Sequence, residues 1–330
     1  MTTDNIERYS KFCEKVYVPI WSKPWWMDTV CGPENWDVWL YQNGEEVLAA
    51  MPYYQEMRGE YHYITKALQT QNNGIIFYYQ EEAKPIAKQI FQEKVINAAC
   101  EFIQSLNLDV YEQQYHYSFQ NWLPFFWNRY TAIPRYTYVL ENIDDLDETW
   151  ERISSKARKL VRKGQRNGEV KTGLDPEAFY IAYEQVFLKQ GIPCPITHDK
   201  WLEIYETCKE HNAGEIFYSE GINGNVSSVL FLVWDEKSAY LLFGGSVPEF
   251  QNLDTYSAVI WETIKFASER GLIYDFEGSV IKRITKAFRE FGGEPKVYFR
   301  IRKVFNPDIM RAETEQVIAE NAKLANQIGQ

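Results

Sequence analysis

The sequence predicts an α/β (α+β) protein of two tandem domains, because one order of elements, a β-hairpin followed by a long helix and a strand, occurs twice. A length of 330 residues also fits two domains. The helix–strand junctions are alike, FIQSLNLDVYEQ and FASERGLIYDFEG, and they align Glu112 with Glu277. We therefore expect domains at residues 1–145 and 146–306, followed by a terminal helix at 307–330, which is rich in Ala, Glu and Lys.

The first half begins with an amphipathic helix expected over residues 4–17. Asn43 and Gly44 lie between two apolar runs, and this pair indicates a tight hairpin because both residues tolerate positive φ. Apolar residues at helical spacing then predict a helix over 84–106, which leads into the strand LDVYEQQ. The first copy is expected to carry an insertion near 69–80.

The second half repeats this order after two helices, expected at 176–189 and 199–211. A three-stranded β-meander is predicted over 214–246, with a Gly- and Asn-rich first turn. A helix over 255–269 follows, with Gly271 as its expected C-cap, and then the strand LIYDFEGS.

Composition and charge exclude several classes of function. Lys and Arg number 35 against 46 Asp and Glu, so the formal net charge of −11 disfavours DNA binding. The first residues do not resemble a secretory signal, and no apolar run of about 18 residues occurs, so we expect a cytoplasmic protein without a membrane span.

Metal chemistry and several cofactor classes also lack support in the sequence. The four histidines have no ligand spacing, so no metal is expected, and the five cysteines are interpreted as reduced structural thiols. The nucleotide-binding glycine loops, the serine-hydrolase elbow and the zinc-protease motif are all missing.

The end of the meander is the first candidate site. Gly244-Gly245-Ser246 end a predicted strand, and a helix begins near Asp254. A strand end that leads to a helix N-terminus offers main-chain N–H groups and the positive end of the helix dipole, which can hold a pyrophosphate or an oxyanion. An ordinary strand-to-helix loop is the alternative.

The following strand carries two carboxylates, Asp275 and Glu277, on one predicted face. Two carboxylates in one cleft would raise each other's pKa and could produce a general base. The alternative is a helix cap and a solvated strand-end acid.

A basic helix is predicted between the two copies and ends at Gly168. Arg158, Arg162 and Arg166 lie on one face at four-residue spacing, with other cations beside them, namely Lys156, Lys159 and Lys163. Such a face can bind the phosphates of a nucleotide, a coenzyme or a tRNA. A solvated surface helix is the alternative.

Three segments resemble characteristic segments of one protein family and follow one another in the same order as in that family. SSKARKLVRKGQRNGEV is similar to the basic K-x-R-x-x-I-R-K-A-x-x-x-G segment of FemAB-like acyltransferases, relatives of the peptidoglycan-bridge aminoacyltransferases. YDFEGS and FREFGGEP resemble the family's DFGGS strand and its F-G-G turn, and WDVWLYQNGEEVLAAMPYY resembles its opening hairpin. The similarity covers roughly residues 20 to 303.

The resemblance implies tandem domains of the GCN5-related N-acetyltransferase (GNAT) fold, each a mixed, partly splayed sheet flanked by helices. In that fold the acyl donor enters where two strands part, here matched by 243–246 and 273–277. Two features depart from the pattern. EFQNLDT replaces the usual coenzyme A signature, and a coiled-coil insertion is missing, so the chain resembles a shorter branch.

The expected function is an N-acyltransferase that passes an acyl or aminoacyl group to an amine of a cell-wall or surface-polysaccharide precursor. The donor is acyl-CoA or aminoacyl-tRNA, with no tightly bound cofactor. Glu277 or Asp275 is expected to accept the proton, unless the phosphate of the substrate does so. Donor binding is expected at Phe243, Gly244, Gly245, Ser246 and Thr255, and phosphate binding at Arg158, Arg162, Lys163 and Arg166. The first copy is expected to shape the acceptor groove. A non-catalytic scaffold that binds a glycan precursor or a partner protein is the alternative.

Overall fold

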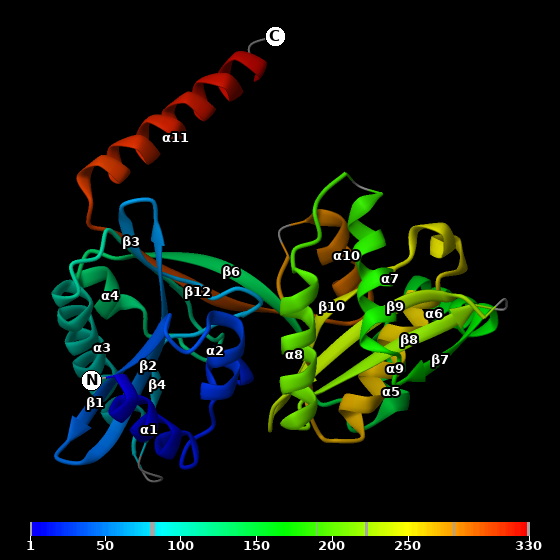
Figure 1. The fold of residues 1–330 in the computed structure, drawn as a ribbon, viewed down its shortest axis with the longest axis horizontal. Helices are drawn as coiled ribbons and strands as arrows, with labels where there is room; N and C mark the ends of the chain where they lie inside the picture. The colour runs from blue at the N-terminus through cyan, green and yellow to red at the C-terminus, as the bar shows by residue number, and fades with distance from the viewer. Residues whose placement is uncertain (1, 80–82, 190, 222–223, 280, 329–330) are drawn as a thin grey trace. The chain divides into compact units, whose positions relative to one another are not determined.

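The computed structural model describes residues 2–79, 83–189, 191–221, 224–279 and 281–328. The chain forms two compact units, one of Met1–Arg135 with Tyr298–Gln330 and one of Tyr136–Val297 (Figure 1). The units therefore divide the chain at other positions than the domains expected from the sequence. The reason is that two strands, β6 (Thr131–Leu140) and β12 (Glu294–Val304), each begin in one unit and end in the other.

The first unit begins with helices and continues with a strand-rich part. Its elements are α1 (Thr2–Cys13), η1 (Ile20–Ser22), α2 (Pro24–Cys31), β1 (Trp36–Asn43), β2 (Glu46–Arg58), β3 (Tyr61–Thr65), β4 (Ile76–Phe77), α3 (Pro85–Ser105), β5 (Val110–Gln114), α4 (Leu123–Trp127), the first half of β6, the end of β12, and α11 (Pro307–Ile328).

The second unit contains the meander and most of the helices that follow it. Its elements are the end of β6, α5 (Leu146–Arg152), α6 (Ser155–Asn167), β7 (Gly168–Thr172), α7 (Pro176–Leu188), α8 (His198–Glu210), β8 (Gly214–Gly221), β9 (Val226–Trp234), β10 (Ser238–Ser246), η2 (Pro248–Leu253), α9 (Thr255–Ser268), β11 (Ile273–Asp275), α10 (Lys282–Glu290) and the start of β12.

The two halves of the chain share one order of elements. Each has three successive strands, a long helix, a short strand, a second helix and a last strand, which are β1–β3, α3, β5, α4 and β6 in one half and β8–β10, α9, β11, α10 and β12 in the other. The last strands are exchanged, because β6 pairs antiparallel with β11 and β12 pairs antiparallel with β5. The fold is a mixed α/β fold of tandem GNAT-like domains.

Local sequence signals explain many of these elements. Asn43 pairs with Glu46 across the β1–β2 turn, where Gly44 has a φ of +61°, as the Asn-Gly signal predicts. Gly271, with a φ of +63°, follows the end of α9 as expected. The amide of Leu272 donates to the carbonyl of Ala267, which closes the end of that helix.

Each unit has its own apolar core. In the first unit the core lies between α3 and the strands, and Trp21, Trp26 and Trp36 are almost fully buried nearby. In the second unit α9 provides the central face, with Val259, Ile264 and others packed against the sheet. Burial of such side chains is the main source of stability, so each unit can hold a site in fixed geometry.

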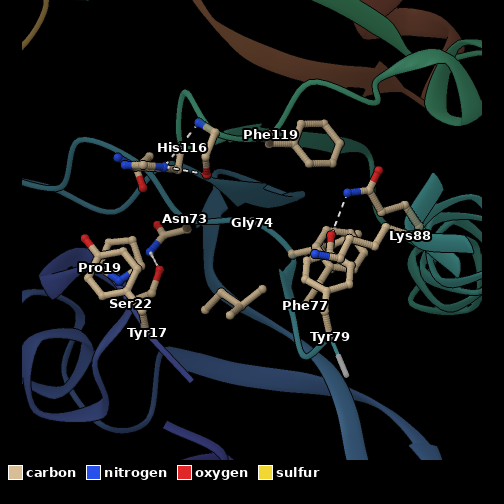
Figure 2. A pocket seen from close by; sticks show the side chains of 15 residues that line it. Tyr17, Pro19, Ser22, Asn73, Gly74, Phe77, Tyr79, Lys88, His116 and Phe119 are labelled. Atoms are coloured by element: carbon tan, nitrogen blue, oxygen red, sulfur yellow. Dashed lines mark hydrogen bonds between the residues drawn. The ribbon is translucent and has the colours of Figure 1, made fainter. Parts of the chain in front are cut away.

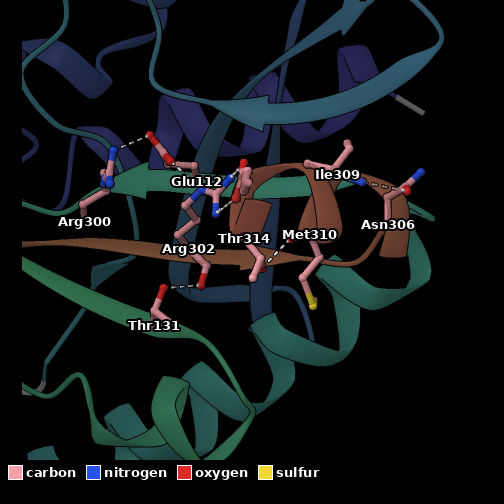
Figure 3. Close-up of polar contacts among 9 residues, drawn as sticks. Glu112, Thr131, Arg300, Arg302, Asn306, Ile309, Met310 and Thr314 are labelled. Carbon is pink, nitrogen blue, oxygen red and sulfur yellow. Dashed lines mark hydrogen bonds and ion pairs between the residues drawn. The ribbon is translucent and has the colours of Figure 1, made fainter. Parts of the chain in front are cut away.

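Glu112 belongs to a cluster of ion pairs between residues of β5, β12 and α11 in the first unit (Figure 3). Its carboxylate lies 2.9 Å from Arg302 Nε and 3.4 Å from Arg300 Nη1. Arg302 also forms a two-point contact with Glu313 of α11, at 2.5 and 3.0 Å. Glu112 therefore ties β5 to β12, and Arg302 extends the cluster to α11, although the sequence aligned Glu112 with Glu277.

The described helices and the possible metal-ligand side chains bear on membrane insertion and metal binding. None of the helices described combines the length and the apolar character that a bilayer crossing needs. Within the described ranges, no three His, Cys, Asp or Glu side chains gather as metal ligands would. All five cysteines have free thiols, and burial raises the pKa of Cys100 to about 12.

Candidate functional site

The candidate site lies in the second unit, where β10 and β11 separate. The two strands pair in parallel over three residues only, and the last pair is Tyr240 with Asp275. β10 continues to Ser246 and stays paired with β9, whereas the amide of Phe276 donates to the carbonyl of Tyr138 on the β6 side, at 2.9 Å. Residues 241–246 therefore have no strand partner on that side within the described structure. The predicted separation near 243 and 275 is present.

A β-bulge lies at the point of separation. The register of β10 against β9 shifts between Leu241 and Phe243, so Leu242 has no partner residue in β9. A bulge leaves one residue outside the ladder, bends the strand and re-aims its main-chain groups. Leu242 was missed by the sequence analysis, since nothing in the run Leu-Leu-Phe distinguishes a bulged from a regular strand.

Two glycines let α7 and α9 pack closely against the end of β10. A β-carbon on Gly244 would lie 2.7 Å from the hydroxyl oxygen of Tyr256 in α9, and one on Gly245 would lie 2.9 Å from a methyl group of Val186 in α7. Consecutive strand residues point to opposite faces, so the two helices cover the two faces of this strand end. Only glycine fits at both positions without a rearrangement.

Two tyrosines beside this strand end were also missed by the sequence analysis. Burial raises the pKa of Tyr256, so its phenol stays protonated at neutral pH. Burial, and to a lesser degree the nearby charges, also raise the pKa of Tyr183 in α7; Glu277 is among those charges. The hydroxyl of Tyr256 points at the main chain of Gly244, where a β-carbon would lie 2.7 Å from it. Tyr183 and Tyr256 could not be identified from the sequence, because it does not reveal which helices pack against the end of β10.

The two carboxylates of Asp275 and Glu277 are not arranged on one strand face as the sequence predicted. β11 ends at Asp275, and Glu277 has a φ of +61°, so the expected strand and its alternation do not extend to Glu277. Asp275 is only 1% exposed, and its Oδ1 accepts hydrogen bonds from Thr137 Oγ1 at 2.5 Å and from the amide of Glu277 at 2.7 Å. Asp275 thus fixes the turn that carries Glu277, and the two carboxylates do not share one strand face.

The motifs YDFEGS and FREFGGEP contact each other in the second unit. Gly292 follows α10 with a φ of +83°. A β-carbon on Gly293 would lie 3.2 Å from the ring of Phe276 and 2.9 Å from the carbonyl oxygen of Phe288. The lack of a side chain at Gly293 therefore lets the chain pass close to the Phe276 ring.

The basic helix α6 is only partly available for phosphate. Arg158 lies 2.5 Å from Glu151, and Lys163 Nζ lies 2.7 Å from both Asp254 Oδ2 and the carbonyl oxygen of Asn252. These two cations of the predicted phosphate site are therefore engaged inside the unit. Arg162 and Arg166 of the predicted site are exposed and lie on one face of the helix with Lys159, whereas the exposed Lys156 pairs with Glu290.

The same helix fixes the start of α9. A β-carbon on Gly164 would lie 2.5 Å from the carbonyl oxygen of Asp254, so the two helices are in close contact there. Asp254 is the N-cap of α9 with a left-handed φ of 59°. The hydroxyl of Thr255 is buried against the hydroxyls of Ser227 and Ser228, at 2.9 and 2.8 Å, so it faces away from solvent. Thr255 can meet a donor only through its main chain.

The corresponding place in the first unit is filled by the chain itself. β3 pairs in parallel with β5 and ends at Thr65, one residue beyond the last pair, Ile64 with Tyr111. Further on, the amide of Asn73 donates to the carbonyl of Gln114, and Asn73 forms an isolated parallel bridge with Tyr115. The extension that β10 makes beyond its partner therefore has no counterpart in β3.

Comparisons with known proteins agree with this geometry. Residues 148–280 match the profile of the acetyltransferase (GNAT) domain, a range that includes α6, β10, α9 and β11. No curated protein matches the sequence.

Several solved structures share the fold at low sequence identity. FemX is 13% identical, with a TM-score of 0.68 over 93% of this chain and 98% of FemX. A tandem GNAT protein from the clavulanic acid biosynthesis pathway is 8% identical, with a TM-score of 0.52 over 91% of this chain and 94% of that protein. L-PGS from Bacillus licheniformis is 8% identical, with a TM-score of 0.53 over 91% of this chain and 92% of that protein.

Proposed function

We propose, from the premise that residues 148–280 form a GNAT acetyltransferase domain, that this chain transfers an acyl or aminoacyl group from an activated donor to an amine. The observation that carries the proposal is the separation of β10 from β11 after Tyr240 and Asp275, together with the bulge at Leu242. A strand end with unpaired main-chain groups can bind the carbonyl of a donor in place of the missing strand.

The proposed reaction starts when the neutral amine attacks the donor carbonyl. Main-chain N–H groups near Leu242 and Gly244 stabilise the oxyanion of the tetrahedral intermediate. A C–N bond forms and the bond from carbon to the leaving sulfur or oxygen breaks. The amine loses one proton, which Glu277 or a phosphate of the substrate accepts, and Tyr256 donates one proton to the leaving group. Asp275 does not transfer a proton itself. It accepts a hydrogen bond from the amide of Glu277 and so positions the Glu277 side chain.

The start of α9 bears on the choice of donor. A helix N-terminus attracts a pyrophosphate through its N–H groups and dipole, but here the carboxylate of Asp254 and its partner Lys163 are at that end. The pair with Asp254 occupies Lys163, the cation nearest to that end, so a pyrophosphate there would find only main-chain N–H groups. This favours an aminoacyl-tRNA over an acyl-CoA, and the exposed stripe of Lys159, Arg162 and Arg166 offers cations for the RNA backbone.

The acceptor proposed is an amine on a cell-wall or surface-polysaccharide precursor. The support is the likeness of the fold to FemX and the resemblance of the motifs around Arg158, Phe276 and Gly292 to FemAB-like acyltransferases.

The test compares donors directly on the full chain. Thermal shift and filter binding are measured with a charged tRNA, an uncharged tRNA, acetyl-CoA and coenzyme A, and transfer is followed to a panel of amino sugars and peptidoglycan precursors. We expect stabilisation and transfer with the charged tRNA, with steep salt dependence that the substitutions Lys159→Gln and Arg166→Gln reduce. Lys94→Gln, on the first unit, serves as the matched control.

Transfer from acetyl-CoA would overturn the donor assignment while leaving acyl transfer intact. The second candidate function, a non-catalytic scaffold, would be favoured if no donor stabilised the protein while a glycan precursor did.

A further inference from the structure

The first unit contains a cavity of about 330 Å³ that the acyl-transfer proposal does not use (Figure 2). Its walls come from the segment after α1, the segment around β4, helix α3 and the loop after β5. Pockets of about 300 to 1,000 Å³ are the usual size for small-molecule sites. The cavity is therefore large enough for one ring-sized ligand.

One side of the cavity is aromatic. Phe77 is stacked with Tyr79, with an angle of 15° between the rings, and with Phe119, with an angle of 8°. The hydroxyl of Tyr79 accepts a hydrogen bond from Gln92 at 2.6 Å, which fixes that ring. These rings form one continuous apolar surface against which the flat face of a ligand can pack.

The opposite side is polar. In Figure 2, Ser22, Asn73 and His116 lie across the cavity from Phe77 and Tyr79. Nδ1 of His116 lies 2.8 Å from the hydroxyl of Ser118 and accepts a hydrogen bond from the amide of Ser118 at 3.2 Å, which fixes the imidazole ring. Amide, hydroxyl and imidazole groups together can donate to and accept from the hydroxyl groups of a ligand.

Of the lining residues that the structure describes, Lys88 alone carries a permanent charge, and that charge is positive although the protein is acidic overall. Lys88 Nζ lies 5.1 Å from the centre of the Tyr79 ring. It forms no ion pair with any residue that the structure describes. Among the described residues that line the cavity there is no carboxylate, so a negative charge on the ligand meets Lys88 and no described acid.

We infer that this cavity binds a sugar ring that carries one negative charge, as a carboxylate or a phosphate. A pyranose has one face of C–H groups, which matches the aromatic side, and hydroxyl groups around its edge, which match the polar side. Its anion lies at Lys88. This inference does not depend on acyl transfer in the other unit, because it concerns binding alone.

The test uses the full chain and saturation-transfer NMR with titration. The probes are uronic acids and sugar 1-phosphates of gluco, galacto and manno configuration, the matching neutral methyl glycosides, and uridine monophosphate. At least one acidic sugar is expected to bind more tightly than its neutral counterpart. Lys88→Gln is expected to weaken that binding about 10-fold, the effect of one charge-assisted hydrogen bond, without changing the binding of the neutral sugar.

Lys94→Gln, on the exposed side of the same helix, is the matched control and is expected to bind as the wild type does. Phe77→Leu is expected to weaken the acidic and neutral sugars alike, because it removes the aromatic face. The inference is overturned if no acidic sugar binds, if Lys88→Gln binds the acidic sugar as tightly as the wild type, or if uridine monophosphate is the only ligand.

Discussion

Gly244 and Tyr256 approach so closely that a β-carbon on the glycine would lie 2.7 Å from the phenolic oxygen. The contact brings a protonated hydroxyl next to the main chain of β10 at the place where β11 has left it. A group that can donate a proton and a strand end that can bind a carbonyl are thus neighbours, which is the arrangement that acyl transfer needs.

Gly244→Ala is expected to impair turnover and to lower the free energy of unfolding. The added methyl group meets both Tyr256 and the carbonyl oxygen of Val229, at 3.0 Å, and overpacking of this kind costs about 1–3 kcal/mol. Thermal unfolding and steady-state rates measure both effects. Gly221→Ala in β8 is the control, because its β-carbon would meet nothing closer than 3.6 Å. Equal rates for the two variants would contradict the role of Gly244.

Tyr256→Phe is expected to reduce turnover by about 100-fold with little change in melting temperature, because it removes only the proton donor. The loss of turnover should be smaller with a donor whose leaving group needs no protonation. Tyr205→Phe in α8 is the matched control. If Tyr256→Phe lost the same factor with every leaving group, the hydroxyl would not be the acid.

Asp275→Asn and Glu277→Gln are expected to act differently. Asp275→Asn should destabilise the chain by about 1–3 kcal/mol, because the buried carboxylate accepts from Thr137 and from the main chain. Thr137→Val should do the same. Glu277→Gln should instead lower turnover and shift its pH profile, with a smaller effect on unfolding. Unchanged turnover in Glu277→Gln would leave proton acceptance to the substrate.

His198 is expected to titrate above the ordinary histidine pKa of about 6.5. Its Nε2 lies 2.6 Å from Glu177, and this hydrogen bond raises the pKa. Because the folded pKa is raised, the contribution of the pair to stability is present below the unfolded pKa and is lost as the pH rises through the folded one. Proton NMR titration should show a lower pKa in Glu177→Gln. The other three histidine signals should not move, and an unchanged His198 pKa would disprove the contact.

The sequence predicted elements better than side-chain environments. The Asn43-Gly44 turn, the meander and the helices on both sides of it follow local signals, namely turn residues and apolar spacing. The exchange of β6 and β12 could not be predicted, because strand partners depend on the tertiary arrangement. The strand expected through Ser279 ends at Asp275, because the turn there is set by contacts with Thr137 and Phe288 rather than by propensity.

The candidate site was predicted in its location and only partly in its residues. A pair of glycines in a strand can indicate close packing, and both Gly244 and Gly245 make such close contacts with neighbouring side chains. The bulge at Leu242 and the approach of Tyr256 have no local signature. The ion pairs of Lys163 and Arg158 could not be predicted, since their acidic partners lie on other elements and a helical charge pattern does not reveal them.

The most direct test of the central claim is amide hydrogen exchange, read by mass spectrometry, with a hydrolysis-resistant aminoacyl-tRNA analogue bound to the full chain. The account predicts added protection in peptides that cover 241–246 and the start of α9, and no such change with uncharged tRNA. Protection confined to other peptides, in a preparation that still transfers the acyl group, would show that the parted strands do not hold the donor.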